Sequence, residues 1–305
     1  MSTHKKITYT KIKCQSACNK VRGGFPYTWD LNVYRGCIHG CQYCYALYSH
    51  AYMNLGDFYH DIYIKENILE QLEKQLSHPN WKREIINLGG VTDNYQAVEA
   101  QYQLMPEILK LLIKYKTPAI ISTKSDLLLR DYDLIGQLAK ITYVNIAATI
   151  TCMDRRIEKL LEPKTISAKR RFTMLKEFKQ THAITSVHFM PIIPYITDTT
   201  ENIEQLFAQA KNSQIDHIIT GMLYLKGPTK PHFFHFIHRE FPHLHHQMAL
   251  LYHSKTLRHT YKTELYQKIN HFKDKYKLSY DYKTAIRQKT HYSKIESAQQ
   301  LSFEF

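Results

Sequence analysis

The stretch from Asn32 to Tyr45, NVYRGCIHGCQYCY, carries three cysteines in a C-x3-C-x2-C spacing, at Cys37, Cys41 and Cys44. This spacing places three thiolates on one short loop, which is what a cubane iron–sulfur cluster needs from its ligands. A [4Fe–4S] cluster has one iron more than this loop has thiolates. We therefore expect these cysteines to hold a [4Fe–4S] cluster with one open iron.

An open iron of this kind can bind the amino and carboxylate groups of S-adenosylmethionine. It can then pass an electron to the sulfonium, which releases a 5′-deoxyadenosyl radical. The spacing therefore predicts radical chemistry with S-adenosylmethionine as cofactor. Tyr43, beside the last cysteine, suits an adenine packed against the loop, and ordinary loop packing explains it equally well.

Zinc is the main alternative occupant of the triplet. Structural zinc sites have four ligands, usually as two separated pairs, and His39 would supply the fourth only if the loop folded back on itself. Cys14 and Cys18 form a second C-x3-C pair. With Cys152 or a histidine they would make an auxiliary metal site, although such cysteines are more often plain buried thiols.

Length and composition limit the class of protein. With 305 residues and 44% hydrophobic content, the chain can bury one large α/β core, and no run approaches the roughly 20 apolar residues of a membrane span. The polar N-terminus lacks the apolar stretch of a signal peptide, so we expect the cytoplasm and reduced thiols. A net charge of +14 favours a nucleic-acid partner only weakly, because the basic residues are spread along the chain.

Apolar β-rich runs alternate with amphipathic stretches, which is typical of repeated βα units and a parallel sheet. The fold class we predict is α/β, a partial (β/α)6 TIM-like barrel with a helical C-terminal extension. Residues 61–65 could form an additional short strand. Pro106 should start or kink the helix in which it lies. The expected organisation is an extension over 1–29, the barrel over 30–226 and a helical region over 227–305. Strands are expected over 31–34, 84–88, 118–122, 143–150, 184–190 and 217–223, and helices over 66–76, 98–115, 131–139, 167–180 and 201–211.

Residues that follow the barrel strands should form the ligand site, because such sites lie at the carboxyl ends of the strands. Paired glycines after the second strand let the backbone approach a ligand closely. A lysine after the third strand can pair with the carboxylate of the cofactor, although solvated loop lysines are commoner. The residues expected to bind S-adenosylmethionine are Tyr43, Gly89, Gly90, Thr92, Asp93, Lys124, Thr149 and Pro191.

The cysteine loop and several later stretches of the chain resemble the radical S-adenosylmethionine superfamily and, within it, the spore photoproduct lyase-like or SplB-type group. The resemblance implies that the three cysteines bind the cluster and that Asp93, Lys124 and Thr149 contact S-adenosylmethionine. It also implies that Glu162 and Arg171 border the substrate mouth or brace it as an ion pair. The matching segments are 32–46, 92–96 with Glu99, 123–125 with 130–131, 161–163 with Arg171, and 191–194 with Asp198.

The chain departs from that group at one position. Spore photoproduct lyases carry a cysteine that returns a hydrogen atom to the product, just before the Ser-Asp that corresponds to Thr92-Asp93. This chain has Gly90-Val91 there. Cys152 is the one catalytic candidate left, and strand alternation with Thr149 and Thr151 predicts that it faces away from the cavity.

The C-terminal region adds two compositional signals. His232, His235 and His238 recur every three residues, which suggests metal binding or a polar helix with coincidental histidines. Lys, Arg and Tyr interleave over 261–287. Such basic and aromatic side chains can bind phosphates and stack on bases, and tyrosines that pack against the barrel, with lysines in water, explain the same pattern. We expect this region to cover the open side of the barrel.

The sequence thus predicts a lyase-like radical enzyme that abstracts hydrogen from an unidentified substrate. A nucleobase in DNA or RNA, and hence DNA repair, is the extension that the resemblance and the charge suggest. A reducing partner such as flavodoxin or ferredoxin would supply electrons. The competing class is a non-catalytic metal- or cluster-bearing protein that binds nucleic acid.

Overall fold

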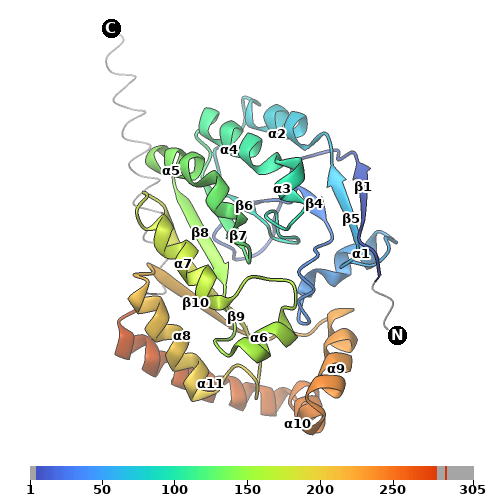
Figure 1. The fold of residues 1–305 in the computed structure, drawn as a ribbon, viewed down its shortest axis with the longest axis vertical. Helices are drawn as coiled ribbons and strands as arrows, with labels where there is room; N and C mark the ends of the chain where they lie inside the picture. Colours follow the sequence, from blue (N-terminus) through green and yellow to red (C-terminus); the bar gives the residue numbers. More distant parts are fainter. Residues whose placement is uncertain (1–4, 280–285, 287–305) are drawn as a thin grey trace.

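A computed structural model of the chain describes residues 5–279 and residue 286. Six parallel strands form an open sheet in chain order, and an antiparallel strand borders the first of them. The first and last strands of the series are not paired with each other, so the sheet is the partial (β/α)6 barrel that the sequence predicts (Figure 1). The parallel strands are β3 (Trp29–Leu31), β6 (Ile86–Leu88), β7 (Ala119–Thr123), β8 (Val144–Thr149), β9 (Ile184–Ile192) and β10 (His217–Met222), and the antiparallel one is β2 (Cys18–Lys20).

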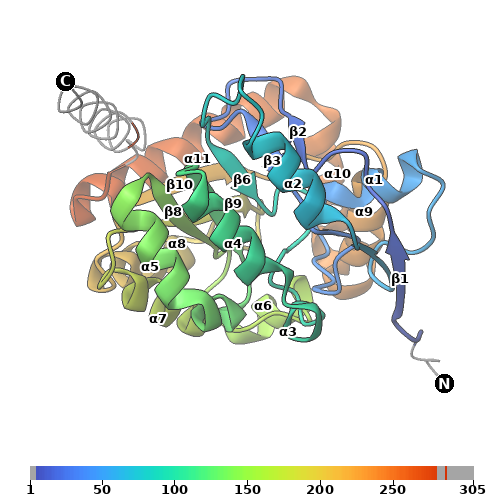
Figure 2. The ribbon, with the colours of Figure 1, turned by 90° about the horizontal axis from the view of Figure 1, so that it is seen from above.

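Helices that connect the strands cover the outer face of the sheet (Figure 2). In one of them, Met105, Ile108, Leu109 and Leu112 are fully buried at helical spacing, which gives that helix an apolar face toward the core. Each such side chain stabilises the fold by about 1.5–3 kcal/mol. The covering helices are α2 (Ile68–Leu76), α4 (Leu104–Lys114), α5 (Tyr132–Ile141), α7 (Ala168–Phe178) and α8 (Thr200–Asn212).

A second, three-stranded sheet carries the segment that precedes the cysteine triplet. It pairs β1 (Thr8–Ile12) with β5 (Asp61–Lys65), and β5 with β4 (Tyr34–Arg35). The expected extra strand over 61–65 is thereby confirmed. The remaining elements are η1 (Tyr45–Leu47), α1 (Tyr48–Tyr52), α3 (Glu99–Tyr102), η2 (Asp126–Asp131), α6 (Arg155–Leu161), α9 (Thr229–Glu240), α10 (Pro242–His253) and α11 (Lys255–Tyr276).

Two predicted elements differ from the structure. The strand expected over 31–34 is wrong, because β3 ends at Leu31 and Tyr34 pairs with Ile64 in the other sheet. The helix expected over 98–115 is divided at Gln103, whose φ of 47° is left-handed. Pro106 lies in the first turn of α4, where a missing N–H breaks no helical hydrogen bond.

The C-terminal helix α11 lies beside β10, the last parallel strand, where Tyr266 donates to the Thr220 carbonyl. Apolar residues of α11, Leu265, Ile269 and Phe272, join the main core, and α11 packs against α8 and α10 (Figure 2). Within the described range no helix has the length and apolar character to span a membrane. Of the interleaved basic and aromatic residues, Tyr280, Tyr282, Lys283 and Arg287 lie outside the described residues.

Candidate functional site

The cysteine triplet lies on the loop between β4 and η1, and its first turn is fixed by backbone contacts. Thr92 Oγ1 and Gln96 Nε2 donate to the Gly36 carbonyl at 2.5 and 3.2 Å, and the Cys37 N–H donates to the Phe58 carbonyl at 3.0 Å. Gly36 has a φ of 79°. The loop is therefore held by residues from two other parts of the chain, around Phe58 and over 92–96.

Gly36→Ala should destabilise the protein by about 2 kcal/mol or more, because a left-handed conformation costs a residue with a Cβ about 1–2 kcal/mol. The added Cβ would also lie 2.8 Å from the Asp61 carbonyl oxygen and 2.9 Å from that of Phe58. Urea unfolding measures the difference. The control is Gly24→Ala, whose Cβ meets nothing within 4 Å and which should change stability by less than about 0.5 kcal/mol. Equal effects in the two variants would contradict this account of the loop.

The three thiols lie in apolar surroundings within electrostatic reach of one another. Cys37 and Cys41 are 9% and 7% exposed, and Cys44 is half-buried. Burial raises the pKa of each thiol to about 12, and a neighbouring thiol of the loop contributes to each shift. Within the described chain, no three His, Cys, Asp or Glu side chains converge on a point suitable for one metal ion.

This donor set fits an iron–sulfur cluster. It consists of soft thiol ligands, which suit iron–sulfur centres and zinc rather than magnesium or calcium. A cubane would take its thiolates on separate irons, so the three thiols need not meet at one point. Burial raises the pKa of the thiols, and the positive charge of bound iron would lower it again by favouring the thiolate. Around Cys41 pack Tyr43, Leu161, Ile193 and Leu223, which keep water from that side of the loop.

Asp93 joins the ends of two barrel strands beside this loop. Its carboxylate accepts from Thr123 Oγ1 at 2.8 and 3.0 Å, from the Lys124 N–H at 2.7 Å and from the Tyr95 N–H at 2.9 Å. His39 Nδ1 lies 3.4 Å from the same carboxylate. Burial lowers the pKa of His39 although Asp93 opposes that shift, so a neutral imidazole links the cysteine loop to Asp93.

Lys124 extends from the end of β7 toward the cysteine loop. Its Nζ lies 5.9 Å from the centre of the Tyr43 ring. Burial opposes the charged form, but the Cys41 thiol and the Glu162 carboxylate raise the pKa of Lys124 above its usual value. A charged amine is thus retained in an apolar site at the carboxyl ends of the strands, where it can pair with an anionic group.

Glu162 and Arg171 form the expected ion pair, which lies at the base of this site. Arg171 donates to Glu162 at 2.6 Å and to the Thr149 and Ile166 carbonyls at 2.7 Å each. The Tyr43 hydroxyl donates to Glu162. The pair therefore connects the cysteine loop to the end of β8.

A second ionic group supports the strand that enters the loop. Tyr34 donates to Glu99 at 2.5 Å, Arg130 pairs with Glu99 and with Asp131 at 2.8 Å, and Tyr95 donates to Asp131 at 3.0 Å. Because Glu99 is fully buried, its charge depends on these partners. These residues stabilise the loop and the Asp93 turn from the same side.

The paired glycines are accounted for by contacts within the protein. A Cβ on Gly89 would lie 2.8 Å from the Ser122 carbonyl oxygen, and one on Gly90 would lie 2.2 Å from Asp30 Oδ1. Thr149 ends β8 opposite His188 of β9. Pro191 lies within β9, after a cis peptide bond, rather than beyond the strand.

Cys152 is buried three residues after the end of β8. Its thiol donates to the Asp154 carbonyl at 3.5 Å, near the start of α6. The neighbouring Thr151 donates to Glu162 at 3.4 Å. Burial raises the pKa of Cys152 to about 12.

Two residues near the site were not expected from the sequence. The Tyr59 hydroxyl donates to the Cys41 carbonyl at 2.6 Å, and no sequence pattern connects these positions. His188 lies among the barrel strands, where burial, His217 and Lys124 lower its pKa to about 4. Its place in a predicted strand, two residues after Ser186, is a signal that polar groups line the barrel interior. His232 of the histidine-rich segment packs its ring 5.7 Å from that of Tyr59.

A partial (β/α)6 barrel with three thiols close together on the loop after its first strand is the architecture of radical S-adenosylmethionine proteins. The family model of the radical SAM superfamily matches residues 31–210, which is more than half of the chain, and the chain belongs to that superfamily. The uncharacterised protein Rv2578c of Mycobacterium tuberculosis is 31% identical over 285 residues, covering 92% of this chain and 84% of the relative. The protein MJ0683 of Methanocaldococcus jannaschii is 30% identical over 207 residues, 68% of this chain and 74% of the relative.

Solved structures of spore photoproduct lyase share the fold. The complex with dinucleoside spore photoproduct has a TM-score of 0.55 and 13% identity, and the match covers 77% of this chain and 66% of the lyase chain. A mutant with bound AdoMet and the same photoproduct gives a TM-score of 0.56 at 12% identity, with 76% and 66% covered. The chain therefore spans just under two thirds of the lyase, and at this identity the likeness shows the fold alone.

Proposed function

We propose that this protein is a radical S-adenosylmethionine enzyme in which Cys37, Cys41 and Cys44 hold a [4Fe–4S] cluster. The observation that supports this most is that three thiols, two buried and one half-buried, share one short loop in a chain that matches the radical SAM family model. When bound, such a cluster supplies the electron that cleaves S-adenosylmethionine to a 5′-deoxyadenosyl radical, which abstracts hydrogen from a substrate.

The cofactor contacts follow from charge and position. Lys124 would pair with the carboxylate of S-adenosylmethionine, because a half-buried ammonium is stabilised by an anionic partner. Asp93 would orient hydroxyl or amine groups, with Thr92 and Thr149 at the neighbouring strand ends. Tyr43 would exclude water from the reacting centre and border the adenine. The backbone at Gly89, Gly90 and Pro191 would form the remaining contacts with S-adenosylmethionine.

The reaction beyond cofactor cleavage is lyase-like in our proposal, with a nucleobase in DNA or RNA as substrate. Cys152 is the candidate for returning a hydrogen atom, since a pKa of about 12 leaves its S–H intact at neutral pH. All six cysteines are free thiols, which supports a reducing, cytoplasmic setting with flavodoxin or ferredoxin as electron donor. Residues 30–226 would form the catalytic unit, and the flanking segments would cover it.

Cofactor cleavage is the decisive test. The protein is reconstituted anaerobically with iron and sulfide, reduced, and incubated with S-adenosylmethionine. We expect formation of 5′-deoxyadenosine, measured by chromatography, and none without reductant. An intact cluster that yields no product would refute the proposed function and favour the non-catalytic, cluster-bearing binding protein.

A further inference from the structure

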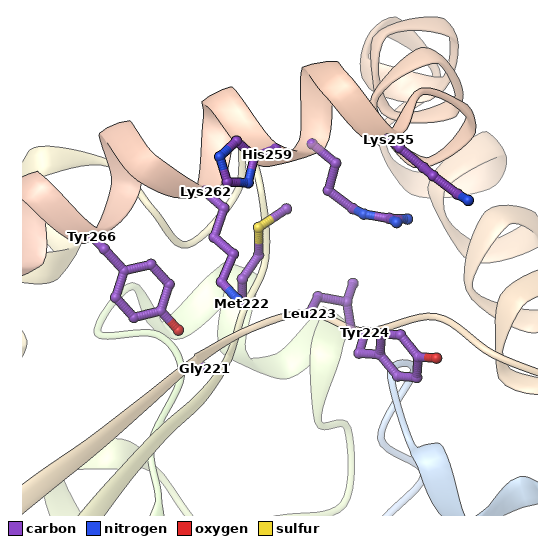
Figure 3. Close-up of a pocket in the computed structure, with 9 residues that line it drawn as sticks. Gly221, Met222, Leu223, Tyr224, Lys255, His259, Lys262 and Tyr266 are labelled. Atoms are coloured by element: carbon purple, nitrogen blue, oxygen red, sulfur yellow. The ribbon is translucent and has the colours of Figure 1, made fainter.

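A cleft of about 470 Å³ lies between the end of β10 and the first half of α11, apart from the cysteine loop (Figure 3). One wall consists of the end of the outermost parallel strand, and the other is one side of the long helix. The residues that line the cleft are Gly221, Met222, Leu223, Tyr224, Lys255, Arg258, His259, Lys262 and Tyr266.

The helical wall of the cleft is basic. Positions 255, 258, 259, 262 and 266 share one face of α11 because they follow the helical period. The apolar residues that fix the same helix, Leu265, Ile269 and Phe272, pack into the main core. A helix face that borders a sheet is usually apolar, whereas this face presents Lys255, Arg258, His259 and Lys262 to the cleft.

Among the residues that the structure describes, the basic side chains of the cleft have no carboxylate partner. The lining residues include no Asp or Glu, and among the residues described by the structure no ion pair involves any of the four basic side chains. Two acidic groups that contact α11 have other partners: Asp198 accepts from the Tyr261 hydroxyl, and Glu204 pairs with Lys275. Like charges held together without a partner repel one another, so an anion that enters the cleft relieves that repulsion.

Two tyrosines accompany the basic residues. Tyr224 is 72% exposed, and it follows directly after Leu223 at the end of the strand wall. Tyr266 donates to the Thr220 carbonyl at 3.5 Å and lies under Lys262 Nζ, 5.7 Å from the ring centre. Recognition of single-stranded nucleic acid combines two components. Basic side chains bind the phosphate backbone, and exposed aromatic rings stack on the bases.

The strand wall of the cleft is connected to the candidate active site through packing contacts. Leu223, in the strand wall, packs in the same hydrophobic group as Cys41 and Tyr43. The segment that continues from this wall reaches the cysteine loop, where Thr229 Oγ1 donates to the Cys44 carbonyl at 2.8 Å. A chain bound in the cleft would therefore lie at the same end of the barrel as the thiols.

We propose that this cleft binds single-stranded nucleic acid, with phosphates among Lys255, Arg258 and Lys262 and a base stacked on Tyr224. The inference deepens the proposed function, on which it rests for identifying the bound nucleic acid as the substrate. None of the residues that line the cleft is a proposed cluster ligand. The shared chemistry is a phosphodiester with an adjacent base, which DNA and RNA both provide.

The test uses the full chain, reconstituted with its cluster, and the fluorescence anisotropy of labelled oligo(dT) and oligo(U). The variant Arg258→Gln with Lys262→Gln should weaken binding by about tenfold at low salt. It should also reduce the slope of log affinity against log salt by about 1.4, since each lost contact to a single strand removes about 0.7. Tyr224→Ala should weaken binding by about tenfold with an unchanged slope, because stacking carries no counterion.

The matched control removes the same charge elsewhere, with Lys140→Gln and Lys169→Gln on exposed positions of α5 and α7. It should change affinity by less than about twofold. Tighter binding of oligo(dT) or of oligo(U) identifies the source of the strand. Absence of binding by the wild type, or equal losses in the cleft variant and the control, overturns the inference.

The outcome is separable from that of the proposed function. Wild-type protein that cleaves S-adenosylmethionine but binds neither oligonucleotide refutes the cleft and leaves the enzyme. Wild-type protein that binds, with the salt slope and the variant losses described, but forms no 5′-deoxyadenosine supports the cleft and refutes the enzyme.

Discussion

Cys41→Ala is expected to abolish both cluster binding and 5′-deoxyadenosine formation. The loop offers three thiols, and the nearby side chains that could replace one, His39 and Glu162, are engaged by Asp93 and by Arg171. A cubane held by two thiolates is exposed to loss of iron. The measurements are iron and sulfide content, visible absorbance of the reconstituted protein and product formation, each expected at the level of a protein-free control.

The control for this prediction is Cys14→Ser, which removes a half-buried thiol that contacts the core outside the loop. Cys14 bonds to Asn67 through its backbone, and serine preserves that contact. This variant should keep its iron and its activity. Full cluster content in Cys41→Ala, or loss of the cluster in the control as well, would exclude Cys41 as a specific ligand.

Breaking the buried pair of Glu162 and Arg171 should have the largest effect on stability. Both side chains are at most 1% exposed, so either single replacement, Glu162→Gln or Arg171→Met, leaves a buried charge without its closest partner. The remaining partners are more distant, with Glu158 3.7 Å from Arg171. We expect each to lower the free energy of unfolding by about 3–5 kcal/mol. That is a large part of the roughly 5–15 kcal/mol available to a typical domain, and urea unfolding measures it.

The double variant separates the charge effect from simple loss of contacts. With both charges absent, the destabilisation should be clearly smaller than the sum of the two single effects, although the Thr149 carbonyl loses its donor. The exposed pair Glu107 and Lys110, 2.7 Å apart, serves as control and should cost less than about 1 kcal/mol when broken. Additive effects at the buried pair would be incompatible with a direct ionic interaction.

The pair should also make stability depend on pH. Burial alone would raise the pKa of Glu162, but Arg171 and Lys124 lower it below the ordinary 4.5. A lowered pKa in the folded state means that the ionised carboxylate stabilises the protein fully above pH 4.5. This contribution is lost as the pH falls from there toward the folded-state pKa. The double variant should lack that part of the acid destabilisation.

Several features of the site were predictable because they depend on local sequence or on the general geometry of barrels. The spacing of Cys37, Cys41 and Cys44 predicts one loop. The rule that strand ends meet at one edge predicts that Asp93 and Lys124 are neighbours, and the Lys124 N–H does donate to Asp93 at 2.7 Å. The end of the first strand was misplaced because Val33 and Tyr34 favour strands, and composition does not show that Tyr34 pairs in a different sheet from Leu31.

The sequence alone determined the α/β class, the order of the strands and the position of the thiol loop, because hydrophobic periodicity and ligand spacing are properties of consecutive residues. Only the tertiary structure decided that Glu162 binds both Arg171 and Tyr43, that His39 reaches Asp93, and that the basic face of α11 borders β10. These contacts join residues far apart in the chain. Their partners are set by how the helices pack, and a helical period shows which residues share a face but not what that face meets.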